Sequence, residues 1–188
     1  MIRKNNIFSI LIFLGIVLVS TIIFAEGAAS SKDNADVQEQ YYIAVKHFRD
    51  REYKIALEEF SNIINNYPKT EAAAKAQYMI GEIYSIQDKP EEALSAYKKT
   101  VELDPANDAA WRSIGEFYEE RKKYDEAVEA YKKVISLIAQ NKKPDQEVIP
   151  LYEKIADILL DRRKYEEALG YYNQILILDK DHRYTSRR

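Results

Sequence analysis

Hydrophobic and small residues recur along this chain at a long, nearly regular interval. Four alanines, 34 to 41 residues apart, are each followed four residues later by an aromatic residue. Thirteen and twelve positions before each alanine stand a large apolar residue and a small one. The alanines are Ala56, Ala93, Ala127 and Ala168, the aromatics Phe60, Tyr97, Tyr131 and Tyr172, and the pairs Ile43-Ala44, Ile80-Gly81, Ile114-Gly115 and Ile155-Ala156. Self-similarity at such a period indicates a repeat array.

The apolar spacing inside one period predicts two helices. Residues such as Ile114, Phe117 and Tyr118 lie three and four positions apart, which is the spacing of one helix face. The small residues allow the two backbones to approach closely, and the aromatic residue covers the same face. Helix starts are predicted at Asp33 or Asn34, Thr70, Pro90, Asn107 and Pro144-Asp145, and stops at Tyr67-Pro68 and Asp104-Pro105.

This register resembles the tetratricopeptide repeat family. Tyr53, Pro90, Tyr124 and Tyr165 stand three residues before the alanines, and His47, Tyr84, Tyr118 and Leu159 stand nine before them. The resemblance implies an all-α fold, a right-handed α-solenoid of about four helix-turn-helix repeats. They are expected at 37–70, 74–107, 108–141 and 149–182, in a domain over 36–179. The outer repeats depart from the family pattern, with Ala44 and His47 in the first and Ala156 and Leu159 in the fourth.

A finer resemblance concerns the second repeat. The Asn66-Tyr67-Pro68 stretch, followed by the Ala-rich start from Glu71 to Tyr78, looks like the extended repeats of bacterial envelope proteins. Examples are the outer-membrane barrel-assembly lipoprotein and the Tol-associated coordinator. The resemblance implies an envelope setting.

The N-terminus predicts export. After Arg3 and Lys4, the run from Ile7 to Phe24 is almost unbroken in apolar character. Residues 1–25 are either a signal peptide, with small residues for cleavage near Ala25 and Gly27, or a membrane anchor. Because basic residues precede the run, the repeats are expected outside the cytoplasm, in the periplasm or anchored to the inner membrane. Residues 26–35 read as a flexible spacer.

Composition excludes several classes of chemistry. The chain has no cysteine, so it can form neither a disulfide nor a cysteine-linked lipid anchor. Its two histidines, His47 and His182, stand in a repeat and in the tail, and its glycines follow no nucleotide-binding pattern. We therefore expect no enzyme activity, cofactor or metal. Acidic pairs such as Glu119-Glu120 are expected to be solvated.

Charge differs between the repeats and the tail. Residues 26–179 carry more acidic than basic side chains, whereas the tail 180–188 is basic. The acidic repeats argue against nucleic-acid binding, because they have no phosphate-seeking face. The tail is expected to be a frayed, solubilising terminus or, alternatively, a contact with phospholipid head groups.

The family resemblance places ligands on the first helix of each repeat. The candidate partner-binding residues are Tyr41, Val45, Tyr78, Glu82, Arg112, Glu116, Glu119, Glu153 and Asp157. Members that clamp a C-terminal carboxylate present Lys and Asn where Tyr41 and Val45 stand, so that mode is disfavoured. The acids either keep the groove hydrated or recognise a basic segment.

Two functions are therefore open. The first is a non-catalytic scaffold or adaptor of the bacterial cell envelope that binds a protein or peptide through the concave groove. The second is an assembly element that associates with itself through its repeat edges. The second helix of the last repeat has more apolar residues than one internal face needs, which predicts an exposed edge that docks on a partner or on a second copy. Alternatively, Ile177 and its neighbours fold back onto the first helix of that repeat.

Overall fold

A computed structural model describes residues 35–68, 70–141 and 145–185, and its regular elements there are all helices. The apolar run from Ile7 to Phe24 and the helix starts expected at Asp33, Asn34 and Pro144 lie outside the described residues. In the part that is described, no helix is both long and apolar enough to cross a membrane. The chain divides into two compact units, one ending at Glu59 and one beginning at Phe60.

The first unit contains a helix over 35–49 and the beginning of α2 (Tyr53–Asn66). Ala44 and Ala56 are fully buried, as their register predicts. The Nδ1 atom of His47 contacts the Glu52 carboxylate, and its Nε2 lies 3.6 Å from Oε1 of Glu59. The turn between the two helices is thus tied together by a histidine and two acids.

Ile43 departs from its equivalents in the later repeats. It is 40% exposed, whereas Ile114 is 3% exposed and Ile155 is fully buried. Ile114 belongs to a core cluster with Ala93 and Tyr97 of the repeat before it. Ile43 has no preceding repeat among the described residues, so the same apolar position is left without a neighbour.

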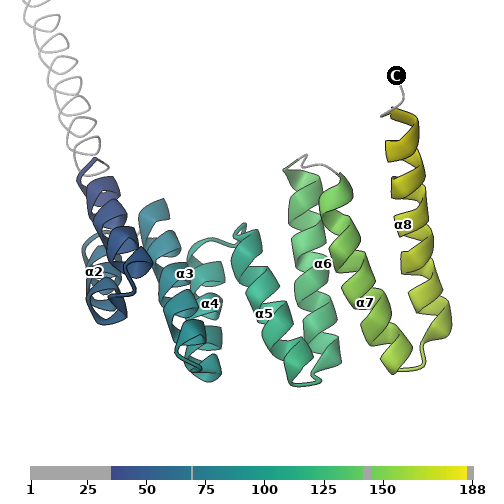
Figure 1. The fold of residues 1–188 in the computed structure, drawn as a ribbon, viewed down its shortest axis with the longest axis horizontal. Coiled ribbons are helices and arrows are strands. Elements are labelled where there is room, and N and C mark those ends of the chain that lie inside the picture. Colours follow the sequence, from purple (N-terminus) through teal and green to yellow (C-terminus); the bar gives the residue numbers. More distant parts are fainter. Residues whose placement is uncertain (1–34, 69, 142–144, 186–188) are drawn as a thin grey trace, which may run out of the picture. The chain divides into compact units, whose positions relative to one another are not determined.

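The second unit consists of successive helix pairs. Its helices are α3 (Glu71–Ile86), α4 (Pro90–Leu103), α5 (Asp108–Glu120), α6 (Tyr124–Gln140), α7 (Ile149–Asp161) and α8 (Tyr165–Thr185). The closest packing joins α3 to α4, α5 to α6 and α7 to α8, and α4 and α6 also pack on the helix after each of them (Figure 1). The expected helix-turn-helix repeats are confirmed.

Most of the predicted helix ends are confirmed. The side chains of Thr70 and Asn107 accept hydrogen bonds from the backbone N–H of Ala73 and Ala110, so both residues cap their helices. Pro90 opens α4. The fourth repeat differs, because Asp145 opens a short 3₁₀ turn, η1 (Asp145–Val148), and α7 begins only afterwards. Pro150 then lies in the first turn of α7, the part of a helix that tolerates proline.

Each turn inside a repeat has the same backbone geometry. A non-glycine residue with positive φ stands five positions before each register alanine: Arg51, Asp88, Lys122 and Arg163. In the third repeat, Lys122 donates its N–H to the carbonyl of Glu119 and Lys123 donates to that of Tyr118, which is the Schellman pattern of helix ends. The other three turns repeat these two hydrogen bonds.

The last helix is longer than expected. The sequence predicts a frayed tail from residue 180, but α8 continues to Thr185. No proline or glycine comes after Gly170 to stop the helix. Ile177 is 53% exposed and Leu178 is half-buried against the core, so the expected exposed edge is present and Ile177 does not fold back.

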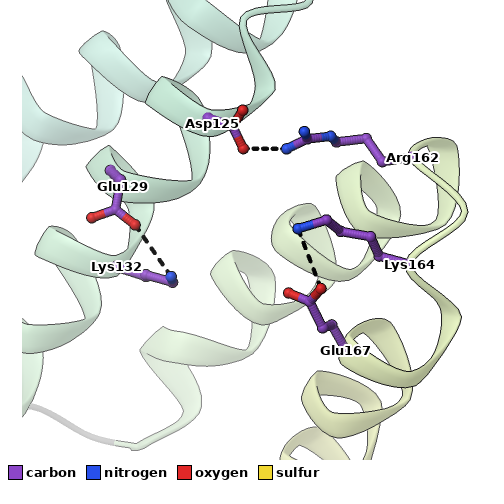
Figure 2. Close-up of polar contacts among 6 residues, drawn as sticks. All are labelled: Asp125, Glu129, Lys132, Arg162, Lys164 and Glu167. Carbon is purple, nitrogen blue, oxygen red and sulfur yellow. Dashed lines mark hydrogen bonds and ion pairs between the residues drawn. The ribbon is translucent and has the colours of Figure 1, made fainter.

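Neighbouring repeats are joined by an arginine that recurs in register. Nη2 of Arg121, just after α5, lies 2.6 Å from Oε1 of Glu91 in the first turn of α4. Arg162, just after α7, pairs with Asp125 in the first turn of α6 (Figure 2). The hydrogen bond from Arg162 keeps the pKa of Asp125 below its usual value. An arginine after the first helix of one repeat therefore binds an acid on the second helix of the repeat before it.

Candidate functional site

Glycine in the second and third repeats allows a tyrosine ring to lie directly on a helix backbone. A Cβ atom at Gly81 would lie 2.5 Å from Cε1 of Tyr97, and one at Gly115 would lie 2.6 Å from Cε1 of Tyr131. Such distances are far inside van der Waals contact, so a side chain at either position would require the tyrosine ring to move. The two tyrosines are buried as a result, with Tyr97 5% exposed and Tyr131 fully covered.

The hydroxyl groups of these tyrosines bind carboxylates on the first helix of the same repeat. Tyr97 donates to Oε1 of Glu82 at 2.7 Å, and Tyr131 donates to Oε2 of Glu119 at 2.5 Å. Tyr172 repeats the arrangement by donating to Oδ1 of Asp157 at 2.9 Å. The buried body of each ring thus places its polar end, and one acid, at the surface of the first helices.

A cavity of about 390 Å³ opens over this surface in the second and third repeats. Its walls come from α3, α4 and α5. The lining residues are Tyr78, Glu82, Ser85, Pro90, Ala93, Tyr97, Ala109, Arg112, Ser113, Glu116, Phe117 and Glu120. We call it the α3–α5 groove. Three carboxylates and one guanidinium give it a net negative charge.

Aromatic rings and acids share the floor of the α3–α5 groove. The rings of Tyr78 and Tyr97 lie 5.6 Å apart at an interplanar angle of 40°. Burial, reinforced by the negative charge of Glu82, raises the pKa of Tyr78 to about 12. Burial and the hydrogen bond to Glu82 also raise the pKa of Tyr97. Both hydroxyls therefore remain protonated at neutral pH and act as neutral hydrogen-bonding groups beside the acids.

The structure brings together four of the nine residues that the sequence proposes for partner binding. Tyr78, Glu82, Arg112 and Glu116 all line the α3–α5 groove. Tyr41 and Val45 lie in the helix over 35–49, in the first unit, where both side chains are partly buried.

Glu119 does not match its expected solvated state. Its Oε2 accepts the Tyr131 hydroxyl and lies 3.0 Å from Nζ of Lys154, so the carboxylate is half-buried and links α5, α6 and α7. The expected solvation is wrong because Tyr131 of α6, four residues after the register alanine Ala127, reaches the Glu119 carboxylate. Glu120, one residue further on, lines the groove instead.

The last two proposed residues lie on α7 and do not line the α3–α5 groove. Glu153 and Asp157 are both exposed, and Asp157 is engaged by Tyr172.

Sequence reasoning missed several groove residues. Phe117 lies beneath the Arg121 guanidinium, with Cζ 3.8 Å from the ring centroid, and lines the α3–α5 groove beside Glu120. Both residues are on the first helix of the third repeat, one and four positions after Glu116. A helical projection of α5 that counted i+4 from Glu116 would have found Glu120.

No metal centre is found among the described residues. No group of three or more His, Asp or Glu side chains in that part of the chain could hold a metal ion. The polar side-chain groups of the α3–α5 groove are carboxylates, tyrosine and serine hydroxyls and one guanidinium. Such a surface can recognise a partner by charge and by aromatic contact area.

Comparison with known families agrees with the fold. Two tetratricopeptide repeat models match the sequence, one over residues 74–107 and the other over 108–181. Together they cover more than half of the chain. The chain belongs to the tetratricopeptide repeat family, whose repeats serve as scaffolds for protein–protein interaction and are typically non-enzymatic.

Solved structures with the same fold are only distantly similar in sequence. A structure of MamA superposes with a TM-score of 0.62 at 20% identity, covering 79% of this chain and 81% of that one. A structure of MamA from Desulfovibrio magneticus RS-1, residue 41 to the end, has a TM-score of 0.57 at 17% identity. The match covers 77% of this chain and 76% of that one. The N-terminal domain of stress-induced protein-1 from C. elegans has a TM-score of 0.52 at 22% identity. That match covers 56% of this chain and 84% of the domain. Among curated proteins, no sequence matches this chain.

Proposed function

We propose that this protein is a scaffold of the bacterial cell envelope that binds a basic segment of another protein in the α3–α5 groove. The observation that supports the proposal is the composition of that groove. Glu82, Glu116 and Glu120 outnumber Arg112, and Tyr78, Tyr97 and Phe117 add aromatic contact area. Aromatic residues carry much of the energy at protein interfaces, and complementary charge steers association.

The two exposed acids of the groove are the best placed to meet a cation. Glu116 and Glu120 are four residues apart on α5 and therefore lie on one helix face. Glu82 is half-buried and already accepts the Tyr97 hydroxyl. A lysine or arginine of the partner would approach Glu116 and Glu120, while its neighbouring apolar residues would contact the rings.

A binding assay with a defined peptide tests this function. A fluorescein-labelled peptide that alternates lysine with leucine should bind the full chain, with an affinity that falls as salt is added. Changing Glu116 and Glu120 together to Gln should weaken binding several-fold and flatten the salt dependence. Changing Glu126 and Glu129, two exposed acids of α6 outside the groove, to Gln is the matched control. Equal affinity for both double variants would refute the α3–α5 groove as the binding site.

The envelope setting is part of the proposal. It is supported by Arg3 and Lys4 ahead of the apolar run from Ile7 to Phe24, which favour export of the repeats. Protease should digest the repeats in cells whose outer membrane has been permeabilised and spare them in intact cells. N-terminal sequencing of the protein from membranes separates a cleaved signal from a retained anchor. Recovery of the repeats in the cytosol would contradict the proposed setting.

A further inference from the structure

The outer face of α8 carries exposed apolar residues at positions that are covered in the other repeats. Leu169 is 59% exposed and Leu176 is 54% exposed. Positions are compared by counting from the register alanine of each repeat. One residue after it stand Leu94 of α4, Val128 of α6 and Leu169 of α8. Eight residues after it stand Val101, Ile135 and Leu176. Those four residues are half-buried and pack against the core clusters. Inside the array, the first helix of the following repeat therefore stacks on this face of the second helix.

The same face presents an acid in the position that binds arginine elsewhere. Glu166 stands two residues before Ala168, as Glu91 and Asp125 stand two residues before their own alanines. Glu91 pairs with Arg121 and Asp125 with Arg162. Glu166 is exposed and has no partner among the described residues, whereas its neighbour Glu167 pairs with Lys164 (Figure 2).

We propose that this face, formed by Glu166, Leu169 and Leu176, binds an amphipathic helix of a partner protein that ends in a basic residue. The chemistry of the occupant follows from the two stacked helices of the second unit. Both α5 and α7 present a buried isoleucine, Ile114 or Ile155, and an arginine seven residues later. A partner helix with the same spacing would cover the two leucines and pair its cation with Glu166. This site is separate from the α3–α5 groove and does not depend on it.

A second copy of this chain fits the face less well. Its first helix, over 35–49, offers the exposed Ile43 in the position of Ile114. Seven residues later, however, it has Asp50 where α5 is followed by Arg121. Stacking that helix on α8 in the same register would therefore place Asp50, and not an arginine, opposite Glu166, although Arg49 and Arg51 flank it. The register therefore favours a foreign helix with an arginine or lysine at that position, because it can form the ion pair that Arg121 and Arg162 form inside the array.

A peptide with the sequence of residues 149–164 is a suitable probe, because it contains Ile155 and Arg162 in the required spacing. Labelled with fluorescein, it should bind the full chain in an anisotropy titration. Changing Leu169 and Leu176 together to Asp should weaken binding at least tenfold. Both side chains are exposed, so circular dichroism should show an unchanged fold. Glu166→Arg should weaken binding about two- to fivefold, as expected for an exposed ion pair.

Charge reversal tests the register directly. The peptide with Arg162→Glu should bind poorly to the native chain and recover its affinity for the Glu166→Arg chain. Glu92→Arg, an exposed acid of α4, is the matched control and should leave binding unchanged. The Glu116 and Glu120 variants should also leave it unchanged, which separates this site from the α3–α5 groove.

Three outcomes would overturn the proposal. The first is a peptide that does not bind. The second is binding that responds equally to Glu92→Arg and Glu166→Arg, which would make the attraction non-specific. The third is concentration-dependent self-association in sedimentation that Leu169→Asp abolishes, because a second copy would then occupy the face.

Discussion

The third and fourth repeats contain the same tyrosine at the same register, yet they bury it to different depths. Tyr131 of the third repeat is fully buried, whereas Tyr172 of the fourth is half-buried. The difference lies on the first helix, where the third repeat has Gly115 and the fourth has Ala156. The ring of Tyr131 occupies the place where a Cβ atom would be, and Ala156 has that atom. Two features therefore differ at Tyr172: Ala156 carries the methyl group that Gly115 lacks, and no helix follows α8 among the described residues.

The depth of the ring determines what its hydroxyl can do. In the third repeat, Tyr131 reaches the half-buried Glu119, which also binds Lys154 and so connects two repeats. In the fourth repeat, Tyr172 reaches the exposed Asp157. The third repeat therefore has a partly covered polar network that joins two repeats, and the fourth has a hydrogen bond to an exposed carboxylate. Hydrogen bonds that are shielded from water are costlier to break.

The largest expected effect comes from filling the space above Gly115. Gly115→Ala should destabilise the protein by about 1 to 3 kcal/mol, and Gly115→Leu by more, because the added atoms meet the Tyr131 ring. Urea denaturation followed by the fluorescence of Trp111, the only tryptophan, measures the change. Trp111 packs against both core clusters and should respond to unfolding.

Gly170 provides the matched control for that experiment. A Cβ atom there would meet nothing within 4 Å, and the residue lies inside α8. Gly170→Ala should therefore raise stability by about 0.5 to 1 kcal/mol through helix propensity alone. If Gly115→Ala were stabilising by the same amount, the close packing of Tyr131 on Gly115 would be wrong.

Alkaline pH should weaken the second and third repeats. Burial raises the pKa of Tyr78 to about 12, and the pKa values of Tyr97 and Tyr131 are also raised. An unfolded tyrosine loses its proton near pH 10, so between pH 10 and the folded pKa the unfolded state binds fewer protons. Stability is then complete below pH 10 and falls as pH rises above it.

Absorbance at alkaline pH can follow this loss. Tyr78, Tyr97 and Tyr131 should ionise only above pH 10 or together with unfolding. The melting temperature should fall over the same range. A titration in which every tyrosine ionises near pH 10 while the fold persists would contradict the buried hydroxyl–carboxylate pairs.

Removing a single tyrosine hydroxyl should lower the free energy of unfolding by different amounts in the third and fourth repeats. Both losses should be smaller than the loss in Gly115→Leu. Tyr131→Phe leaves the half-buried Glu119 with one fewer donor and should cost about 1 to 2 kcal/mol. Tyr172→Phe removes a bond to an exposed carboxylate that water can replace, so it should cost less than about 0.5 kcal/mol. The same urea assay compares them, and equal costs would mean that ring depth does not protect the hydrogen bond.

The smallest expected effect concerns the turns. Lys122 has a φ of 56°, a conformation that glycine adopts without strain. Lys122→Gly should therefore stabilise the protein by roughly 0.5 to 1 kcal/mol. Lys133→Gly, in the interior of α6, should destabilise it by a similar amount and serves as the control. A loss of stability in Lys122→Gly would indicate that the lysine side chain contributes contacts of its own.

The repeat architecture could be predicted from the sequence because close packing restricts residue size. Gly81 and Gly115 are required by the rings that lie on them, and Ala93 and Ala127 are buried where helices meet. Caps such as Thr70 and Asn107 are local, since each binds a backbone group three residues away. The 3₁₀ turn at Asp145–Val148 was missed because Pro144 and Pro150 are both compatible with a helix start.

Part of the candidate site was predictable for the same reason. Tyr78, Glu82, Arg112 and Glu116 follow from the register, because residues on one face of the first helices must line the same side of neighbouring repeats. Glu119 could not be assigned in this way. Its state depends on a tyrosine twelve residues away and on a lysine of the next repeat, and neither lies on its own helix.

By itself, the sequence determined the period of the array, the pairing of helices within a repeat and the places where only glycine or alanine fits. These features depend on side-chain volume and on hydrogen bonds over a few residues. The tertiary structure decided which acids are engaged: it paired Glu91 and Asp125 with arginines of the following repeats and left Glu166, in the same register, without a partner among the described residues. An acid has the same charge in every sequence context, and only the neighbours that the fold brings within reach decide whether that charge is paired inside the protein or left for a partner.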